Sequence, residues 1–221
     1  QVHFFCHMHQ TITTMIPYSD DLMIFGGDHT IWSMRGDPMD GGRIDLITPN
    51  SGSANVSLLF GRGDGTFEVQ RRIEVGVAPG AVQAVDVNGD GRVDLVTPNY
   101  FSSDVLVLLG RGDGTFEAQR NFEVGNDPIT VQAVDVNGDG RVDIITPNSG
   151  SDDVSVLVGR GDGTFEVERR YTVGDNPFGV ETADVNADGR IDLITPNVRS
   201  SDLSVLLGRG DGTFEGQRRF A

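Results

Sequence analysis

Three acidic segments of nine residues recur along the chain at intervals of 49 residues, and they carry the side chains best suited to bind a metal ion. Each has carboxylate or amide oxygens at positions 1, 3, 5 and 9, a glycine at position 6, and an arginine at position 7 whose carbonyl adds a ligand. Such oxygens, turned toward one point, repel one another unless a hard cation lies between them. The pattern predicts three Ca²⁺ sites, with ligands Asp86, Asn88, Asp90, Arg92 and Asp94 in the first, Asp135, Asn137, Asp139, Arg141 and Asp143 in the second, and Asp184, Asn186, Asp188, Arg190 and Asp192 in the third.

Two alternative interpretations of these segments compete with that of calcium loops in a repeat protein. An EF-hand loop shares the spacing but requires a glutamate at position 12, where this chain has Thr97, Thr146 and Thr195. The flanking residues also alternate between apolar and polar, or run apolar, as β-strands do. The other alternative, a set of Asx-turns whose carboxylates are only solvated, stays open.

A further segment, 37–45, has the same spacing but lacks two of the ligands. Asp37 and Asp45 keep the acids at positions 1 and 9, whereas Met39 and Gly41 stand where oxygen donors are needed. We therefore expect no calcium, or only weak binding, at this degenerate first copy.

The acidic segments belong to a longer repeat that contains a turn signal and a proline. An Asp-Gly pair between apolar strands favours a tight β-hairpin, and the octapeptide Gly-Arg-Gly-Asp-Gly-Thr-Phe-Glu occurs unchanged at 61–68, 110–117, 159–166 and 208–215. The Arg-Gly-Asp within it is explained by what such turns require rather than by receptor binding. A proline is expected to end a strand, and Thr-Pro-Asn recurs at 48–50, 97–99, 146–148 and 195–197.

These signals predict that each unit is a meander of four short strands. In the second unit the strands are expected at 81–87, 92–97, 104–109 and 116–124. Repeated four-stranded units of this length are typical of β-propellers. The predicted fold class is all-β, a β-propeller-type array of four four-stranded antiparallel blades with an N-terminal strand extension, and its parts are the extension 1–30 and repeats at about 31–80, 81–129, 130–178 and 179–221.

The chain resembles the FG-GAP/VCBS repeat family, which includes the blades of integrin α-subunit propellers. The resemblance lies in the Asp-x-Asn-x-Asp-Gly-x-x-Asp loops and the Gly-Asp-Gly-Thr-Phe segments, and it covers roughly residues 37–221. It implies a propeller fold, calcium in the loops between strands one and two, and an extracellular setting. It implies neither a reaction nor a particular ligand.

Composition narrows the function classes. The formal charge of −16 argues against nucleic acid and anionic membranes as partners, and no apolar run reaches the ~20 residues of a membrane span. The start at Gln1, in place of Met, suggests an exported product, so an extracellular or cell-surface location is expected. The repeats contain no His or Cys and their recurring aspartates are assigned to calcium, so we expect no enzymatic activity.

In a meander, alternate loops lie at the same edge of the sheet, so the calcium loops and the hairpins are expected to share one face. The loops from strand two to three and from strand four to one form the opposite face, which we call the variable face because its residues differ among copies. Tyr100, Phe101 and Phe178 on it are candidate ligand contacts, for example to a glycan or a cell-surface molecule.

The first forty residues differ from the rest, since they hold every His and Met and the single Cys and Trp. Three outcomes stay open for residues 1–30: they close the chain's own ring, they add a strand to a neighbouring molecule and so build an oligomer or filament, or they do neither. A transition-metal site is a weaker alternative for His3, Cys6, His7 and His9. The favoured function is a non-catalytic, calcium-stabilised structural or adhesive module that self-associates. A lectin-like propeller and an accessory domain of a larger secreted protein are the alternatives.

Overall fold

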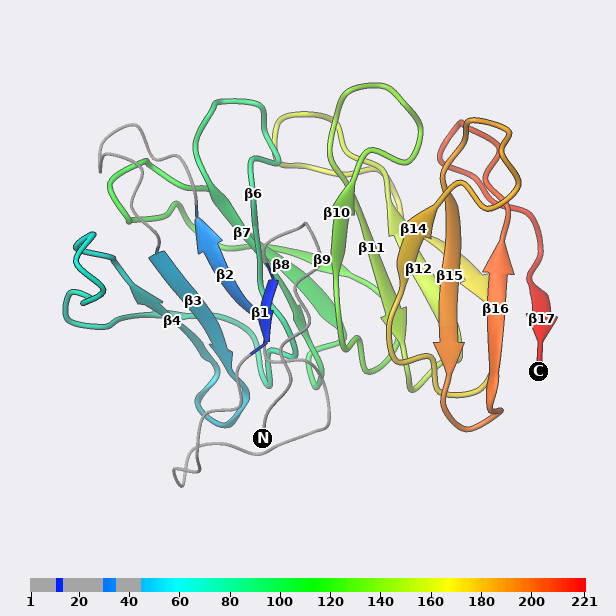
Figure 1. Cartoon of the computed structure of the whole chain (residues 1–221), viewed down its shortest axis with the longest axis horizontal. Helices are drawn as coiled ribbons and strands as arrows, with labels where there is room; N and C mark the ends of the chain where they lie inside the picture. Colours follow the sequence, from blue (N-terminus) through cyan, green and yellow to red (C-terminus); the bar gives the residue numbers. More distant parts are fainter. Residues whose placement is uncertain (1–10, 14–29, 35–44) are drawn as a thin grey trace.

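The computed structural model describes residues 11–13, 30–34 and 45–221, which form four antiparallel sheets arranged in a row (Figure 1). Strand order within every sheet follows the sequence, so each is a meander. The first sheet contains β1 (Thr11–Thr13), β2 (Thr30–Met34), β3 (Asp45–Asn50), β4 (Asn55–Leu59) and β5 (Arg71–Glu74), with a 3₁₀ helix (Ser51–Ser53) between β3 and β4. The predicted all-β array of four blades is confirmed.

The other three sheets have four strands each. The second contains β6 (Gln83–Val85), β7 (Asp94–Asn99), β8 (Asp104–Leu108) and β9 (Arg120–Glu123). The third contains β10 (Gln132–Val134), β11 (Asp143–Asn148), β12 (Asp153–Leu157) and β13 (Arg169–Thr172). The fourth contains β14 (Glu181–Ala183), β15 (Asp192–Asn197), β16 (Asp202–Leu206) and β17 (Arg218–Phe220).

The described part of the N-terminal extension adds a strand to the first sheet. In β1, Thr11 pairs with Trp32 of β2, so this sheet has five strands where the others have four. The first and fourth sheets lie at opposite ends of the row, and the described residues therefore form an open array rather than a closed ring (Figure 1). The second strand-like run of the extension, 21–25, lies outside the described residues.

The strand boundaries differ from the predicted ones in ways that have physical causes. β7 continues through Pro98 to Asn99, because the Pro98 carbonyl accepts the N–H of Gly80 on the side where the β6 ladder has already ended. On the other side Pro98 pairs with Val105. The fourth strand begins at Arg120 instead of 116, since the hairpin closes through an isolated bridge between Gly110 and Phe116 before the chain rejoins the sheet.

The hydrophobic core lies between neighbouring sheets rather than within any one of them. One cluster joins the second sheet to the third, where Val105 and Val107 of β8 pack with Ile144 and Leu157. Equivalent clusters join the first sheet to the second and the third to the fourth. Each sheet therefore depends on its neighbours for burial, as expected of a repeat architecture.

Candidate functional site

Each of the three predicted calcium-binding segments, 86–94, 135–143 and 184–192, connects the first strand of its sheet to the second. We keep the name calcium loops for them, and they lie along the same edge of the row (Figure 1). The backbone reverses through left-handed residues at positions 4 and 6, with φ of 75° at Gly89 and 82° at Gly91 in the first loop. Glycine adopts this conformation at no steric cost. In the third loop, position 4 is Ala187, which is held at φ 60°.

The aspartate at position 1 organises the loop through backbone hydrogen bonds. Asp86 Oδ1 accepts the N–H of Gly89 at 2.7 Å and that of Asp90 at 3.2 Å, while Oδ2 accepts the N–H of Gly91 at 2.8 Å. The second loop repeats these bonds around Asp135. In the third loop the bonds from Gly189 and other loop N–H groups lower the pKa of Asp184.

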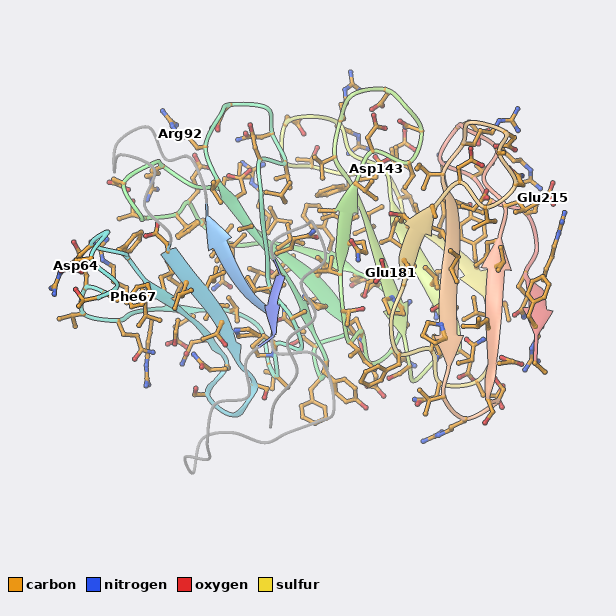
Figure 2. All side chains as sticks on the ribbon, viewed as in Figure 1. Asp64, Phe67, Arg92, Asp143, Glu181 and Glu215 are labelled. Carbon is orange, nitrogen blue, oxygen red and sulfur yellow. The ribbon has the colours of Figure 1, made fainter. Side chains whose placement is uncertain are left out.

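Positions 3, 5 and 7 interact with one another at the exposed tip. Asn88 Oδ1 accepts the N–H of Asp90 at 3.0 Å, and Asp90 Oδ1 accepts the N–H of Arg92 at 2.8 Å. The Arg92 guanidinium, labelled in Figure 2, lies 3.7 Å from Asp90 Oδ2 and is largely exposed. Positions 1, 3 and 5 together are called the loop rim below.

The aspartate at position 9, called the loop base below, is buried and connects two loops. Asp94 Oδ2 accepts the N–H of Val87 at 2.9 Å, and its Oδ1 accepts the N–H of Gly110 at 2.8 Å. Asp143 (Figure 2) and Asp192 make the same two bonds in their own sheets. Because Gly110 begins the hairpin, these bonds confirm that the calcium loop and the hairpin of a sheet lie on the same face of the array.

Burial is the main influence on the pKa of the base residues Asp94 and Asp143. Burial first, and then the nearby negative charges of Asp90 and Asp86, outweigh the lowering effect of the two N–H donors and together raise the pKa of Asp94 to about 6. Burial likewise raises the pKa of Asp143, with Asp139 and Asp135 contributing. An unpaired negative charge at the base is thus unfavourable in the metal-free loop, and a cation would relieve it.

The degenerate first copy keeps the base. Asp45 is buried and its Oδ1 accepts the N–H of Gly61, which begins the first hairpin, at 2.7 Å. This connecting role was not foreseen from the sequence, yet a signal was present. Position 9 is retained in the one copy where positions 3 and 5 are lost, which indicates a task independent of metal.

The loops fit calcium in the kind of donor they offer. All the candidate ligands are oxygens, and a carboxylate oxygen that accepts one N–H still has a lone pair for a cation. In the described ranges no three His, Cys, Asp or Glu side chains gather closely enough to hold a metal ion, because the carboxylates point at backbone N–H groups instead. The assignment of Ca²⁺ to the fifteen residues named above therefore remains a prediction.

The Arg-Gly-Asp aspartate serves the hairpin turn. Asp113 Oδ1 accepts the N–H of Thr115 at 2.9 Å and its hydroxyl at 2.6 Å. These bonds, led by the one from the hydroxyl, lower the pKa of Asp113. Gly112 and Gly114 have φ of 80° and 77°, as the turn requires. The interpretation of the tripeptide as turn chemistry is thus supported by its contacts.

The variable face brings together only part of its candidate set. Tyr100 and Phe101 lie edge to face, with ring centroids 5.0 Å apart, and Phe101 is 60% exposed. They are held by the connection between the first and second sheets, where the N–H of Phe101 donates to the Val77 carbonyl. Phe178 lies in the connection between the third and fourth sheets and bonds to Pro196, so it belongs to a different blade junction.

Some sequence-based candidates lie outside the described residues. These include 37–44 of the degenerate loop and the proposed transition-metal ligands His3, Cys6, His7 and His9. Among the residues that the structure does describe, no helix has the length and hydropathy needed to cross a membrane.

Four meander sheets stacked in sequence order, all with the Asp-Gly hairpin and three with the complete acidic loop at the same edge, define a β-propeller-type repeat protein. The family model for the FG-GAP-like repeat matches residues 40–97, 86–146 and 135–195. The chain belongs to the FG-GAP-like repeat family. No curated protein matches it in sequence.

Solved structures of low sequence identity share the fold. The chain is similar to a 6-phosphogluconolactonase-like protein from Bacteroides uniformis (13% identity, TM-score 0.63, 88% of this chain and 55% of that one). It is also similar to an Agrocybe aegerita lectin that recognises non-reducing terminal N-acetylglucosamine (23% identity, TM-score 0.52, 81% of this chain and 49% of that one). A third similar structure is the V. cholerae biofilm matrix protein Bap1 (15% identity, TM-score 0.50, 80% of this chain and 26% of that one). The chain thus spans about half of the first two structures and about a quarter of the third.

Proposed function

We propose that the chain is a non-catalytic, extracellular structural or adhesive module whose three complete loops bind Ca²⁺ and which self-associates. The observation that carries the proposal is the repetition of one loop geometry, in which the carboxylates at positions 1 and 9 accept the same backbone N–H groups in the first two loops and position 9 does so in the third. Burial, and to a smaller extent the neighbouring carboxylates, raise the pKa of the base residues Asp94 and Asp143. Membership of the FG-GAP-like repeat family supports the extracellular setting.

Calcium acts here as a structural ion. Within each loop the position 1, 3, 5 and 9 side chains and the position 7 carbonyl hold it, and the ion neutralises their mutual repulsion. The rim residues orient the loop, and the base joins it to the hairpin of the same sheet. A bound ion therefore stiffens one edge of each sheet without taking part in a reaction.

Calcium titration by isothermal calorimetry tests this function. We expect three sites per chain with dissociation constants on the order of 10⁻⁴–10⁻³ M, the range of extracellular modules. Asp135→Ala removes a rim ligand and should reduce the number of sites to two. Asp162→Ala changes an exposed hairpin carboxylate that accepts only from Thr164, so it is the matched control and should keep three. Absence of binding at millimolar Ca²⁺ would refute the proposal.

A second candidate, glycan binding at the variable face, is favoured by the exposed aromatic pair Tyr100 and Phe101 and by the similarity to the Agrocybe aegerita lectin. The equivalent positions in the third sheet are Ser149 and Gly150, so any such site would occur once rather than in every blade. A glycan array tests this candidate, and Phe101→Ala should abolish any signal.

A module of this kind also suits an accessory domain of a larger secreted protein.

A further inference from the structure

Every interface between sheets is built from the same alternate positions. We call the side of a sheet that is directed toward the next sheet its forward face, and the opposite side its rear face. On the third sheet Ile145, Val154 and Val156 lie on the forward face and are fully buried. They pack with Leu193 and Leu206 on the rear face of the fourth sheet. A forward face therefore fits the rear face that follows it.

An aromatic pair recurs at these interfaces. Phe122 of β9 meets the hairpin residue Phe165 of the third sheet, with ring centroids 4.9 Å apart and planes at 82°. One repeat later, Tyr171 of β13 meets Phe214 at 5.5 Å and 83°. At these two interfaces the last strand of one sheet supplies a ring to the hairpin phenylalanine of the next sheet, whereas Ile73 stands at this position in the first sheet. Edge-to-face pairs of this kind add to the energy of the buried area.

An arginine at the start of the last strand makes a second recurrent contact. Arg120 Nη1 donates to the carbonyl of Asp162 at 2.9 Å, and Arg169 Nη1 donates to the carbonyl of Gly212 at 3.1 Å. In both cases the acceptor lies in the hairpin of the next sheet. Apolar packing, the aromatic pair and the arginine together define the interface.

The forward face of the fourth sheet presents these groups without a covering sheet among the described residues. Leu203 is 44% exposed, whereas Val154 at the same position of the third sheet is 0% exposed. Val185 is 49% exposed against 3% for Val136. Phe220, which corresponds to Tyr171, is 55% exposed.

The rear face of the first sheet is the complementary end. Leu59 is half-buried, whereas its counterpart Leu108 is buried against the preceding sheet. Phe67 occupies the hairpin position of Phe165 and Phe214, the residues that contact a ring from the preceding sheet. Asp64 and Phe67 lie at one end of the row, and Glu215 of the fourth sheet lies at the other (Figure 2). One molecule thus carries both halves of the same interface at opposite ends.

We propose that the forward face of the fourth sheet binds the rear face of the first sheet in a second copy of this chain. The inference rests on the proposed self-association and assigns it to these two faces. Phe220 packs edge to face on Phe67, and Arg218 donates to hairpin carbonyls next to Asp64. Two copies joined this way contain eight blades, within the usual range of propellers, and a contact that does not close a ring builds a filament.

Cross-linking of two variants tests which faces meet. Phe67→Cys and Phe220→Cys are made separately in full-length chains that also carry Cys6→Ser, and one of the two bears an affinity tag. A short bis-maleimide is added to each variant alone and to their mixture. We expect a covalent pair containing one copy of each variant in the mixture only. If cross-linking is equal in the separate samples and in the mixture, the assignment of the faces is wrong.

Sedimentation velocity supplies the second measurement. The unaltered chain should form assemblies, and Phe220→Asp should weaken association at least tenfold. Val69→Asp changes a residue that is 85% exposed on the loop before β5, so it should leave association unchanged. If the unaltered chain stays monomeric, both this interface and the proposed self-association are refuted. That result is the one expected if another blade of a longer chain covers the fourth sheet. Assemblies that persist in Phe220→Asp without the mixed cross-link refute only the interface.

Discussion

The base and the rim of a calcium loop use the same residue type for different tasks. At the base, Asp94 is fully buried and both of its oxygens accept backbone N–H groups from two separate loops. At the rim, Asp90 lies at the exposed tip and contacts only its own loop. Where the loop has degenerated, the base survives as Asp45 while two rim ligands are gone. Folding therefore constrains the base directly, whereas positions 3 and 5 of the rim are constrained chiefly by the ion that they are proposed to bind.

The largest expected effect is loss of a base carboxylate. Asp143→Ala leaves the buried N–H groups of Val136 and Gly159 without an acceptor. Each unsatisfied group costs about 1–3 kcal/mol, so the loss of both should lower the free energy of unfolding by roughly 2–6 kcal/mol. Denaturant melts in EDTA measure this, since the effect must persist without calcium. If Asp143→Ala and the rim variant Asp139→Ala were equally destabilising in EDTA, the distinction between base and rim would fail.

Removal of calcium from all three rims should have the next largest effect. At roughly 1 mM Ca²⁺, a site with a dissociation constant of 10⁻⁴–10⁻³ M adds about 0.4–1.4 kcal/mol, so three sites add ~1–4 kcal/mol. The melting temperature should drop in EDTA and recover when Ca²⁺ is restored. Mg²⁺ at the same concentration is the control, because it accepts such flexible oxygen sets poorly. An identical melting temperature in EDTA and in Ca²⁺ would show that calcium does not stabilise the fold.

The calcium effect should depend on pH through the base. The pKa of Asp94 lies above its ordinary value of 3.8, at about 6, so its proton favours the metal-free fold at acid pH and this contribution is lost as pH rises through 6. Calcium binds only the ionised form of the Asp94 carboxylate. The difference in melting temperature between Ca²⁺ and EDTA should therefore grow between about pH 5 and pH 7.5. A difference that is constant over this interval would show that the base does not couple to the ion.

A single rim substitution should have a smaller and conditional effect. Asp139→Ala removes one ligand of the second loop and should lower the free energy of unfolding by about 0.4–1.4 kcal/mol in millimolar Ca²⁺. In EDTA most of that loss should vanish, because Asp139 is exposed and contacts mainly Arg141 and Asn137. Paired chemical melts with and without calcium measure the difference. Equal losses in both buffers would place the role of Asp139 in the fold alone.

The sequence predicted the repeat, the blades and the shared edge of loops and hairpins because each depends on local chemistry: alternating strands, Asp-Gly turns and acidic loops. The second role of the base was missed, since the bond from Gly110 to Asp94 joins residues 16 positions apart and leaves no local pattern. The choice of Tyr100, Phe101 and Phe178 as ligand contacts stays a prediction. The partners of these residues depend on how the sheets stack: Phe101 bonds to Val77 before the second sheet, and Phe178 bonds to Pro196 of the fourth.

The smallest expected effect distinguishes the third loop from the other two. Ala187 holds a left-handed φ of 60° where Gly89 and Gly138 have 75° and 76°. Nothing lies within 4 Å of a Cβ built on either glycine, so the penalty at Ala187 is backbone strain rather than a clash. Relief of that strain by Ala187→Gly is worth about 1–2 kcal/mol, offset by the greater freedom of glycine in the unfolded chain, about 0.4–1 kcal/mol. We expect a net gain of about 0–1.6 kcal/mol, centred on ~0.8 kcal/mol, together with tighter calcium binding at this loop. Gly138→Ala should have the opposite effect on the second loop. Calorimetric titration of both variants checks this, and unchanged affinities would show that the rim tolerates the strain without loss of function.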